Sequence, residues 1–334
     1  MPAKFILATL SSCSSAKALD LTQGIQEFLD QPFFALIKIG DMAYDIQLNQ
    51  VHANGIDFSF LECGTGPLAL CVHGFPDSAH TWRHLLPELA KAGYRAVAPF
   101  TRGYAPTSIP LDHCYQTGAL AADVNALHQA LGGGHDAVLI GHDWGASTVY
   151  VAGANAPDRW GRVVALSVPP GLALRHAFQG NLAQIQRSWY MFYFQSALAE
   201  TAIPANDYAL IDLLWKKWSP GLESPEDQQN FQQCVAEPEN LKAALGYYRA
   251  SLGSGPRTEA YNAIQNKGLE PLTQPVLYLH GREDGCIGAD LAEQAQAQCP
   301  WLTVEILEGV GHFMQLEKPQ LINQRITDFL HHSI

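Results

Sequence analysis

The chain has 334 residues, 47% of them hydrophobic, so it can bury one large core or two smaller ones. Its formal net charge is −12 and no block of Lys or Arg stands out, which argues against nucleic acid or an anionic membrane surface as a partner. The seven cysteines form no C-x-x-C pair, so we expect reduced thiols that make neither a disulfide framework nor a zinc site; they stand at positions 13, 63, 71, 114, 234, 286 and 299.

The first 45 residues are predicted to be an N-terminal extension, with a short helix over 19–38. Leu10–Cys13 resembles a lipoprotein cleavage box, but the apolar run Phe5–Leu10 is shorter than the ~7–15 residues that a signal peptide needs. No stretch approaches the ~18 apolar residues of a membrane span. We therefore expect a cytoplasmic protein, with export as the weaker alternative.

From about residue 46 the pattern is that of alternating strands and helices. Residues 56–62 alternate like a half-buried strand, and 68–72 form the continuous apolar run typical of a central parallel strand. Further strands are predicted over 95–99, 137–140, 163–168, 276–279 and 303–307, and helices over 81–92, 119–131, 146–154, 291–298 and 320–330. This order predicts the α/β class, a mostly parallel sheet with helices on both faces.

The interval 171–269 interrupts the alternation. It is rich in aromatic residues, is compatible with helices and contains no comparable strand candidate. We predict a helical cap inserted between two parts of one α/β core, 46–170 and 270–334. A cap over the carboxyl ends of parallel strands is where a ligand crevice is expected.

The segment Gly141–Gly145 has the spacing of the G-x-S-x-G nucleophile elbow, with Asp143 in the place of the usual serine. An aspartate is already ionised at neutral pH, with a reference pKa of ~3.9, and the positive end of the following helix favours its charge. A carboxylate attacks saturated carbon and leaves an alkyl ester that must then be hydrolysed. The predicted chemistry is therefore substitution at carbon.

An oxyanion hole is expected beside Asp143. The loop His73–Pro76 follows the strand 68–72, and in this kind of fold it supplies one backbone N–H, here that of Phe75. The other N–H comes from the residue after the nucleophile, Trp144. The side chain of His73 itself is expected to be a buried turn residue.

A histidine and a second acid complete the predicted catalytic set. His312 lies late in the chain in a glycine-flanked loop, as the order nucleophile, acid, histidine requires, so we predict it as the base. Asp284 follows the preceding strand and is the predicted acid, with Glu283 as the reserve and a helix N-cap as the alternative role. The other usual place for the acid, Ser167–Gly171, contains no carboxylate.

Together these motifs resemble the epoxide hydrolases of the α/β-hydrolase superfamily, over roughly residues 46–334. H-G-F-P, R-G-Y, G-H-D-W-G, H-G-x-x-D and G-x-G-H-F occur in the family's order, at 73–76, 102–104, 141–145, 280–284 and 309–313. One departure is Phe100, where the family usually has an aspartate after the proline. That segment supports the fold and not the chemistry.

The resemblance implies two cap tyrosines that hydrogen-bond the epoxide oxygen, Tyr190 and Tyr248, with Tyr193 and Tyr247 as the alternatives. A phenol with a pKa of ~10 can protonate the alkoxide that forms when an epoxide opens. The expected product is a vicinal diol. No metal or organic cofactor is expected.

The expected partners are a small hydrophobic epoxide and water, because aromatic residues are expected to line the substrate site: Trp144, Trp189, Phe192 and Phe313. A haloalkane or haloacetate dehalogenase, with the same Asp143 nucleophile, is the nearest alternative. A non-catalytic ligand-binding protein of the same fold is the alternative from another class. The sequence leaves open which epoxide and which enantiomer is used, and whether the chain forms a homo-oligomer.

Overall fold

A computed structural model describes residues 45–253 and 255–331. Its contacts divide the chain into two units, Met1–Asp45 and Ile46–Ile334, of which the second is the subject here. The helix predicted over 19–38 and the candidate export segment lie outside the described residues. None of the described helices is long and apolar enough to cross a membrane.

The core of the described chain is one sheet in the order β1-β2-β4-β3-β5-β6-β7-β8. Its strands are β1 (Gln47–Ala53), β2 (Ile56–Cys63), β3 (Leu68–Val72), β4 (Arg95–Pro99), β5 (Val138–His142), β6 (Arg162–Leu166), β7 (Val276–Gly281) and β8 (Leu302–Leu307). β2 pairs antiparallel with β1 and β4, and every other pair is parallel. The predicted fold class is confirmed.

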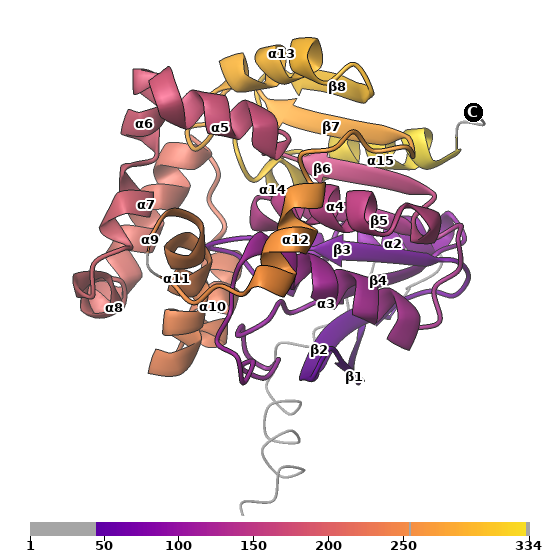
Figure 1. Cartoon of the computed structure of the whole chain (residues 1–334), viewed down its shortest axis with the longest axis horizontal. Coiled ribbons are helices and arrows are strands. Elements are labelled where there is room, and N and C mark those ends of the chain that lie inside the picture. The colour runs from indigo at the N-terminus through magenta and orange to yellow at the C-terminus, as the bar shows by residue number, and fades with distance from the viewer. Residues whose placement is uncertain (1–44, 254, 332–334) are drawn as a thin grey trace, which may run out of the picture. The chain divides into compact units, whose positions relative to one another are not determined.

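Helices cover both faces of this sheet (Figure 1). On one face α3 (Thr117–Ala130) packs against α4 (Trp144–Asn155), and on the other α2 (Leu86–Lys91) contacts α15 (Pro319–His331). The shorter or peripheral helices of the sheet domain are η1 (Ala79–Trp82), η2 (Pro157–Arg159), α13 (Ala289–Gln298) and α14 (Met314–Glu317). Strands β3, β5 and β7 are buried along their whole length, as their continuous apolar runs require.

The segment between β6 and β7 is helical. It contains α5 (Gly171–Gly180), α6 (Leu182–Arg187), α7 (Trp189–Tyr193), α8 (Leu198–Ala202), α9 (Ala205–Trp218), α10 (Pro225–Cys234), α11 (Pro238–Leu252) and α12 (Glu259–Lys267). Within α9, residues 206–208 have positive φ angles, so its regular part begins after them. Figure 1 shows α6 to α11 gathered at one end of the sheet, whereas α12 packs against α3 and α4. We call α5 to α11 the cap.

The structure differs from the prediction at one helix and at one strand of the sheet domain, and it adds the short helices η2 and α14. The predicted helix over 81–92 is divided into η1 and α2, because Pro87 lacks the N–H of a helix interior and occupies the first turn of α2. The edge strand β1 was not predicted, since four of its seven residues are polar and only Ala53 is buried. The turn from β1 to β2 has positive φ at Asn54 and Gly55.

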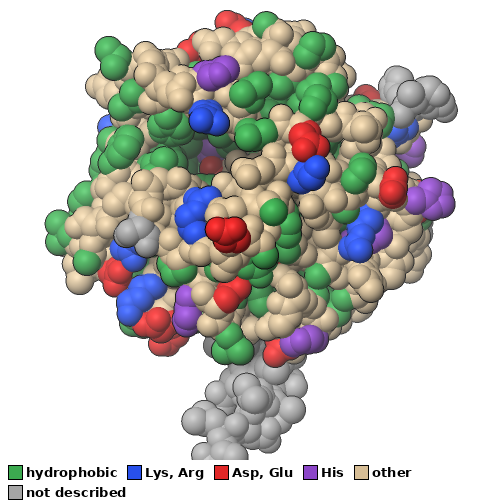
Figure 2. All heavy atoms as spheres, in the orientation of Figure 1, with side chains coloured by type: hydrophobic (Ala, Val, Ile, Leu, Met, Phe, Trp, Pro, Cys, Tyr) green, Lys and Arg blue, Asp and Glu red, His purple; other side chains and the backbone are tan. Residues whose placement is uncertain are grey.

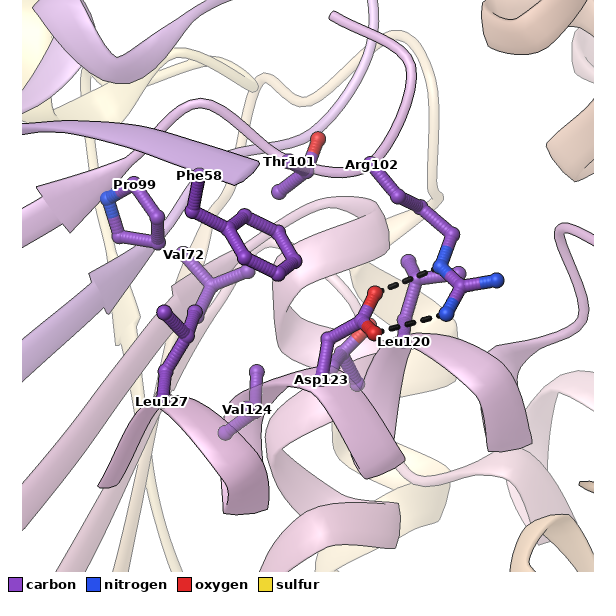
Figure 3. A pocket seen from close by; sticks show the side chains of 10 residues that line it. Phe58, Val72, Pro99, Thr101, Arg102, Leu120, Asp123, Val124 and Leu127 are labelled. Carbon is purple, nitrogen blue, oxygen red and sulfur yellow. Dashed lines mark hydrogen bonds and ion pairs between the residues drawn. The ribbon is translucent and has the colours of Figure 1, made fainter. Parts of the chain in front are cut away.

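A buried ion pair ties the loop after β4 to α3. Asp123 accepts hydrogen bonds from Arg102 Nε (2.5 Å) and from the terminal guanidinium nitrogen Nη2 (2.7 Å), and both residues are under 4% exposed. Asn54 Nδ2 donates to the same carboxylate at 2.7 Å. Figure 3 shows the pair beside a small pocket lined by apolar side chains of the sheet and of α3. No predicted catalytic residue lines this pocket, so we assign it to the fold.

Replacing Asp123 by Ala should lower the free energy of unfolding by about 3 kcal/mol, because it leaves the buried guanidinium of Arg102 with only the half-exposed Asp112, 3.7 Å away, as counter-charge. Lys91→Ala is the control, since it breaks a half-exposed pair with Glu88 and should cost less than about 1 kcal/mol. Urea unfolding measures both. Equal losses in the two variants would contradict this assignment.

Candidate active site

Asp143 lies in the sharp turn between β5 and α4. Its backbone has φ 54° and ψ −116°, a conformation that costs about 1–3 kcal/mol in a residue with a side chain. The flanking glycines permit the turn. A methyl group at Gly145 would lie 2.0 Å from the carbonyl oxygen of Val72, and one at Gly141 would lie 2.3 Å from the carbonyl oxygen of Gly145. The turn thus projects one carboxylate from the carboxyl end of the sheet.

The Asp143 carboxylate meets the loop that follows β3. The backbone N–H of Phe75 donates to Asp143 Oδ1 at 2.8 Å, and Asp143 is only 7% exposed. Gly74 is required here, because a methyl group at this position would lie 2.3 Å from the same oxygen. The structure therefore brings the predicted oxyanion donor Phe75 onto the predicted nucleophile, and Trp144 begins α4 directly after it.

His312 lies between two carboxylates. Its Nδ1–H donates to Asp284 Oδ2 at 2.9 Å, and its Nε2 is 3.5 Å from Asp143 Oδ2. The other oxygen of Asp284 accepts backbone N–H groups of Cys286 (2.7 Å) and Ile287 (2.9 Å), so this carboxylate is fixed. The reserve acid, Glu283, accepts instead from the backbone N–H of Val310.

These charges control the protonation of His312. Burial alone lowers its pKa, but Asp284 and Asp143 outweigh that effect and raise the pKa from 6.5 to about 10. In the free protein His312 is therefore an imidazolium at neutral pH. Loss of the negative charge on Asp143 removes part of what stabilises this cation.

The backbone of His312 is held by residues that the sequence reasoning did not select. Its carbonyl oxygen accepts hydrogen bonds from Ser167 Oγ (2.6 Å) and from His142 Nε2 (2.9 Å), and its N–H donates to the carbonyl oxygen of Trp218 (3.0 Å). Burial lowers the pKa of His142 to about 3, so this ring is neutral and donates through Nε2. Ser167 lies at the second position considered for the acid in the sequence. That position was the one feature of the sequence that could have pointed to this residue.

Two cap tyrosines, on different helices, lie near Trp144 and Cys286. Tyr248, on α11, is 1% exposed, and its hydroxyl makes no hydrogen bond; its ring centroid is 5.0 Å from that of Trp144. Tyr190, on α7, is 2% exposed and its hydroxyl lies 3.3 Å from Cys286 Sγ. Burial raises the pKa of both phenols well above 10 and the charge of Asp143 adds to this, so both stay protonated.

The two alternative tyrosines have other surroundings. The hydroxyl of Tyr247 donates to the carbonyl oxygen of Arg102 at 2.9 Å. Tyr193 is only partly buried, and its ring contacts are with its neighbours Trp189 and Phe194. Among these four, Tyr190 and Tyr248 are the pair whose ring centroids lie close together, at 5.7 Å.

The aromatic residues predicted to bind substrate are not all in one place. Trp144 packs against Tyr248, but Phe313 is fully buried and stacks on Trp215 at 3.8 Å between centroids. On α7, Trp189 is 36% and Phe192 is 51% exposed. Figure 2 shows a hollow with hydrophobic and basic side chains at its rim and an acidic side chain visible inside it. The outer aromatic residues of α7 therefore lie at the surface, not against Asp143.

Comparison with known proteins identifies the same fold and a family of enzymes. The α/β-hydrolase fold family matches residues 67–319. Epoxide hydrolase 3 of Mus musculus is 30% identical over 296 residues, which is 85% of this chain and 77% of that protein. This chain belongs to the epoxide hydrolases of the α/β-hydrolase superfamily.

Other relatives extend the likeness over nearly their whole length. An epoxide hydrolase of Caballeronia sordidicola is 29% identical over 334 residues, covering 88% of this chain and 98% of that protein. The solved structure of an epoxide hydrolase from an endophytic Streptomyces has a TM-score of 0.71 at 29% identity, over 85% of this chain and 95% of the other. The resemblance stated from the sequence motifs is confirmed.

Gly74→Ala should reduce kcat for an aryl epoxide such as styrene oxide by at least about 100-fold, because the new methyl group displaces Asp143 Oδ1 from the Phe75 N–H. Gly180→Ala is the control, since a methyl group there meets nothing within 4 Å. Circular dichroism verifies that both variants fold. A Gly74→Ala variant with the parent's kcat would show that this contact does not matter.

Proposed function

We propose that this enzyme hydrolyses a hydrophobic epoxide to a vicinal diol through a covalent ester on Asp143. The observation that carries the proposal is the placement of the Asp143 carboxylate. One oxygen accepts the Phe75 N–H, while the other lies beside His312 Nε2 in a site that two buried phenols also reach. We propose further that the enzyme acts in the cytoplasm and that water is its second substrate.

In the first step Asp143 Oδ2 attacks an epoxide carbon and the carbon–oxygen bond of the ring breaks. Tyr190 and Tyr248 donate hydrogen bonds to the ring oxygen, and one of them transfers its proton to the departing alkoxide. Their protonated state, which burial favours, is the one that can donate. The oxygen stays attached to the substrate, so no separate leaving group has to be bound.

In the second step water attacks the carboxyl carbon of the ester. Esterification has removed the charge of Asp143, so the pKa of His312 falls and its proton passes to the phenolate, which becomes a phenol again. The neutral imidazole can then take a proton from water. Asp284 holds the ring and stabilises the imidazolium that results. The tetrahedral oxyanion develops on Oδ1, next to the N–H of Phe75 and that of Trp144. Its collapse breaks the bond between the carboxyl carbon and the substrate oxygen, and the imidazolium gives its proton to the departing alkoxide, which leaves as the diol. The new carboxyl group returns its proton to His312, so that Asp143 is again a carboxylate.

The central test is one turnover in oxygen-18 water, followed by peptide mass analysis. Label should enter the Asp143 side chain before it reaches the diol in quantity, because the first diol oxygen comes from the carboxylate. His312→Gln should alkylate but hydrolyse slowly, so its intact mass should rise by the mass of the epoxide. Direct labelling of the diol, with no adduct on the variant, would overturn the proposal.

Tyr248→Phe should lower the rate of ester formation by about 100-fold, the loss typical of one donor to a developing oxyanion. Its neighbour gives a matched control. Tyr247→Phe removes a hydroxyl that is committed to Arg102, so it should alkylate at close to the parent's rate. Rapid-quench mass measurement gives both rates. A larger loss in Tyr247→Phe would reverse the assignment of the two tyrosines.

The hydrolytic step should slow as the pH falls, because protonated His312 cannot accept a proton from water. The pKa that governs this step should lie below the value of about 10 in the free enzyme, since the ester lacks the charge of Asp143. Single-turnover decay of the ester over a range of pH measures it. An ester that decays at the same rate at acidic and neutral pH would exclude His312 as the base.

One observation bears on the dehalogenase alternative. The indole Nε1 of Trp144 is buried and has no hydrogen-bond partner, and such a donor could hold a halide. Two phenols poised to protonate an oxygen have no use in that reaction, which favours the epoxide. Release of free halide from haloalkanes or haloacetates, without diol formation from epoxides, would favour the dehalogenase. Binding of epoxides without any product would favour the non-catalytic alternative.

A further inference from the structure

The site contains a thiol that the proposed mechanism does not use. Cys286 is 1% exposed, and its Sγ lies 3.3 Å from the Tyr190 hydroxyl. Its backbone is fixed from both sides: the N–H donates to Asp284 Oδ1 at 2.7 Å, and the carbonyl oxygen accepts from Gln184 Nε2 at 2.8 Å. The backbone that carries this thiol is therefore held in place, and its Sγ lies beside the Tyr190 hydroxyl.

This thiol, the nucleophile and the base lie close enough to share one ion. One donor atom from each of Asp143, Cys286 and His312 lies within 4.8 Å of the other two. His312 Nε2 and Asp143 Oδ2 are 3.5 Å apart. In a tetrahedral zinc site, with bonds of about 2.0–2.3 Å, neighbouring ligand atoms are about 3.3–3.6 Å apart. Shifts of about 1 Å would bring the three atoms to these spacings.

The histidine is already oriented as a metal ligand would be. Its Nε2 is buried and has no hydrogen-bond partner, while its Nδ1–H donates to Asp284. Metal-binding histidines almost always donate their other ring N–H to such a group. The two carboxylates, Asp143 and Asp284, also give the site the charge that attracts a cation.

We propose that Asp143, Cys286 and His312 bind a thiophilic divalent cation, such as Zn²⁺ or Cd²⁺, and that this ion inhibits the enzyme. A sulfur, a nitrogen and an oxygen ligand suit these ions, whereas Mg²⁺ and Ca²⁺ require oxygen ligands. Binding releases to the solvent the proton of the Cys286 thiol and the Nε2 proton of the His312 imidazolium, while Nδ1–H stays bonded to Asp284. The inhibition rests on the proposed function, because the ion occupies its nucleophile and its base, but the binding does not.

Binding is tested first without any substrate. The parent protein should bind about one Cd²⁺ in equilibrium dialysis and should develop the ultraviolet absorption of a cadmium–thiolate bond. Cys286→Val should weaken the binding by about 100-fold or more, since even changes outside the ligand set cost about 10- to 100-fold. Cys299→Val is the matched control, because this buried cysteine lies outside the site and should leave the binding and the absorption unchanged.

Inhibition is then tested with styrene oxide. Zn²⁺ should inhibit the parent and the Cys299→Val variant, whereas Cys286→Val should need about 100-fold more Zn²⁺. Mg²⁺ should have no effect on any of them. Absence of cadmium binding by the parent, or equal binding by Cys286→Val, overturns the inference. Cadmium binding at Cys286 in a protein that forms no diol would leave the ion site standing and reject the proposed function instead.

Discussion

At Asp143 the chain turns from β5 into α4 through a backbone conformation that residues with side chains rarely adopt. Tight packing around the turn offsets the free-energy cost of this conformation. The same packing leaves no room for a side chain at the glycines beside it. The glycines at 74, 141 and 145 each approach another backbone or the carboxylate itself. The contacts of Asp143 with Phe75 and His312 depend on this turn, because it sets where the carboxylate leaves the sheet.

Electrostatics divides the work between the two carboxylates on either side of His312. Asp284 accepts hydrogen bonds from two backbone N–H groups and from the imidazole, so its position and that of the ring are fixed. Asp143 accepts one N–H and faces the cap, which leaves its second oxygen free to react. The same imidazole is thereby a counter-ion in one half of the proposed cycle and a base in the other.

The sequence was sufficient to predict those parts of the structure that a local pattern of residues determines. Glycine spacing revealed the turn at Asp143, and continuous apolar runs revealed the buried strands. The edge strand β1 lacks such a pattern, although Asn54-Gly55 is a recognised hairpin signal that would have indicated it. His142 and Cys286 were missed because tertiary contacts alone bring them to His312 or Tyr190, and Ser167 was passed over because it carries no carboxylate. Helical periodicity likewise could not tell the outward face of α7 from its inward face.

The hydroxyl of Tyr247 also restrains the movement of the cap. It is one of several bonds that tie the cap to loops at the sheet's edge, the others being Asn240 Nδ2 to Gly103 O (2.7 Å), Trp215 Nε1 to Pro76 O (3.1 Å) and Gly288 N to Gln184 Oε1 (2.9 Å). Swinging the cap away as one body would break all of them, at about 0.5–1.5 kcal/mol each. Because these bonds hold the cap in place, a molecule that reaches Asp143 without breaking them must fit the space that the closed cap leaves.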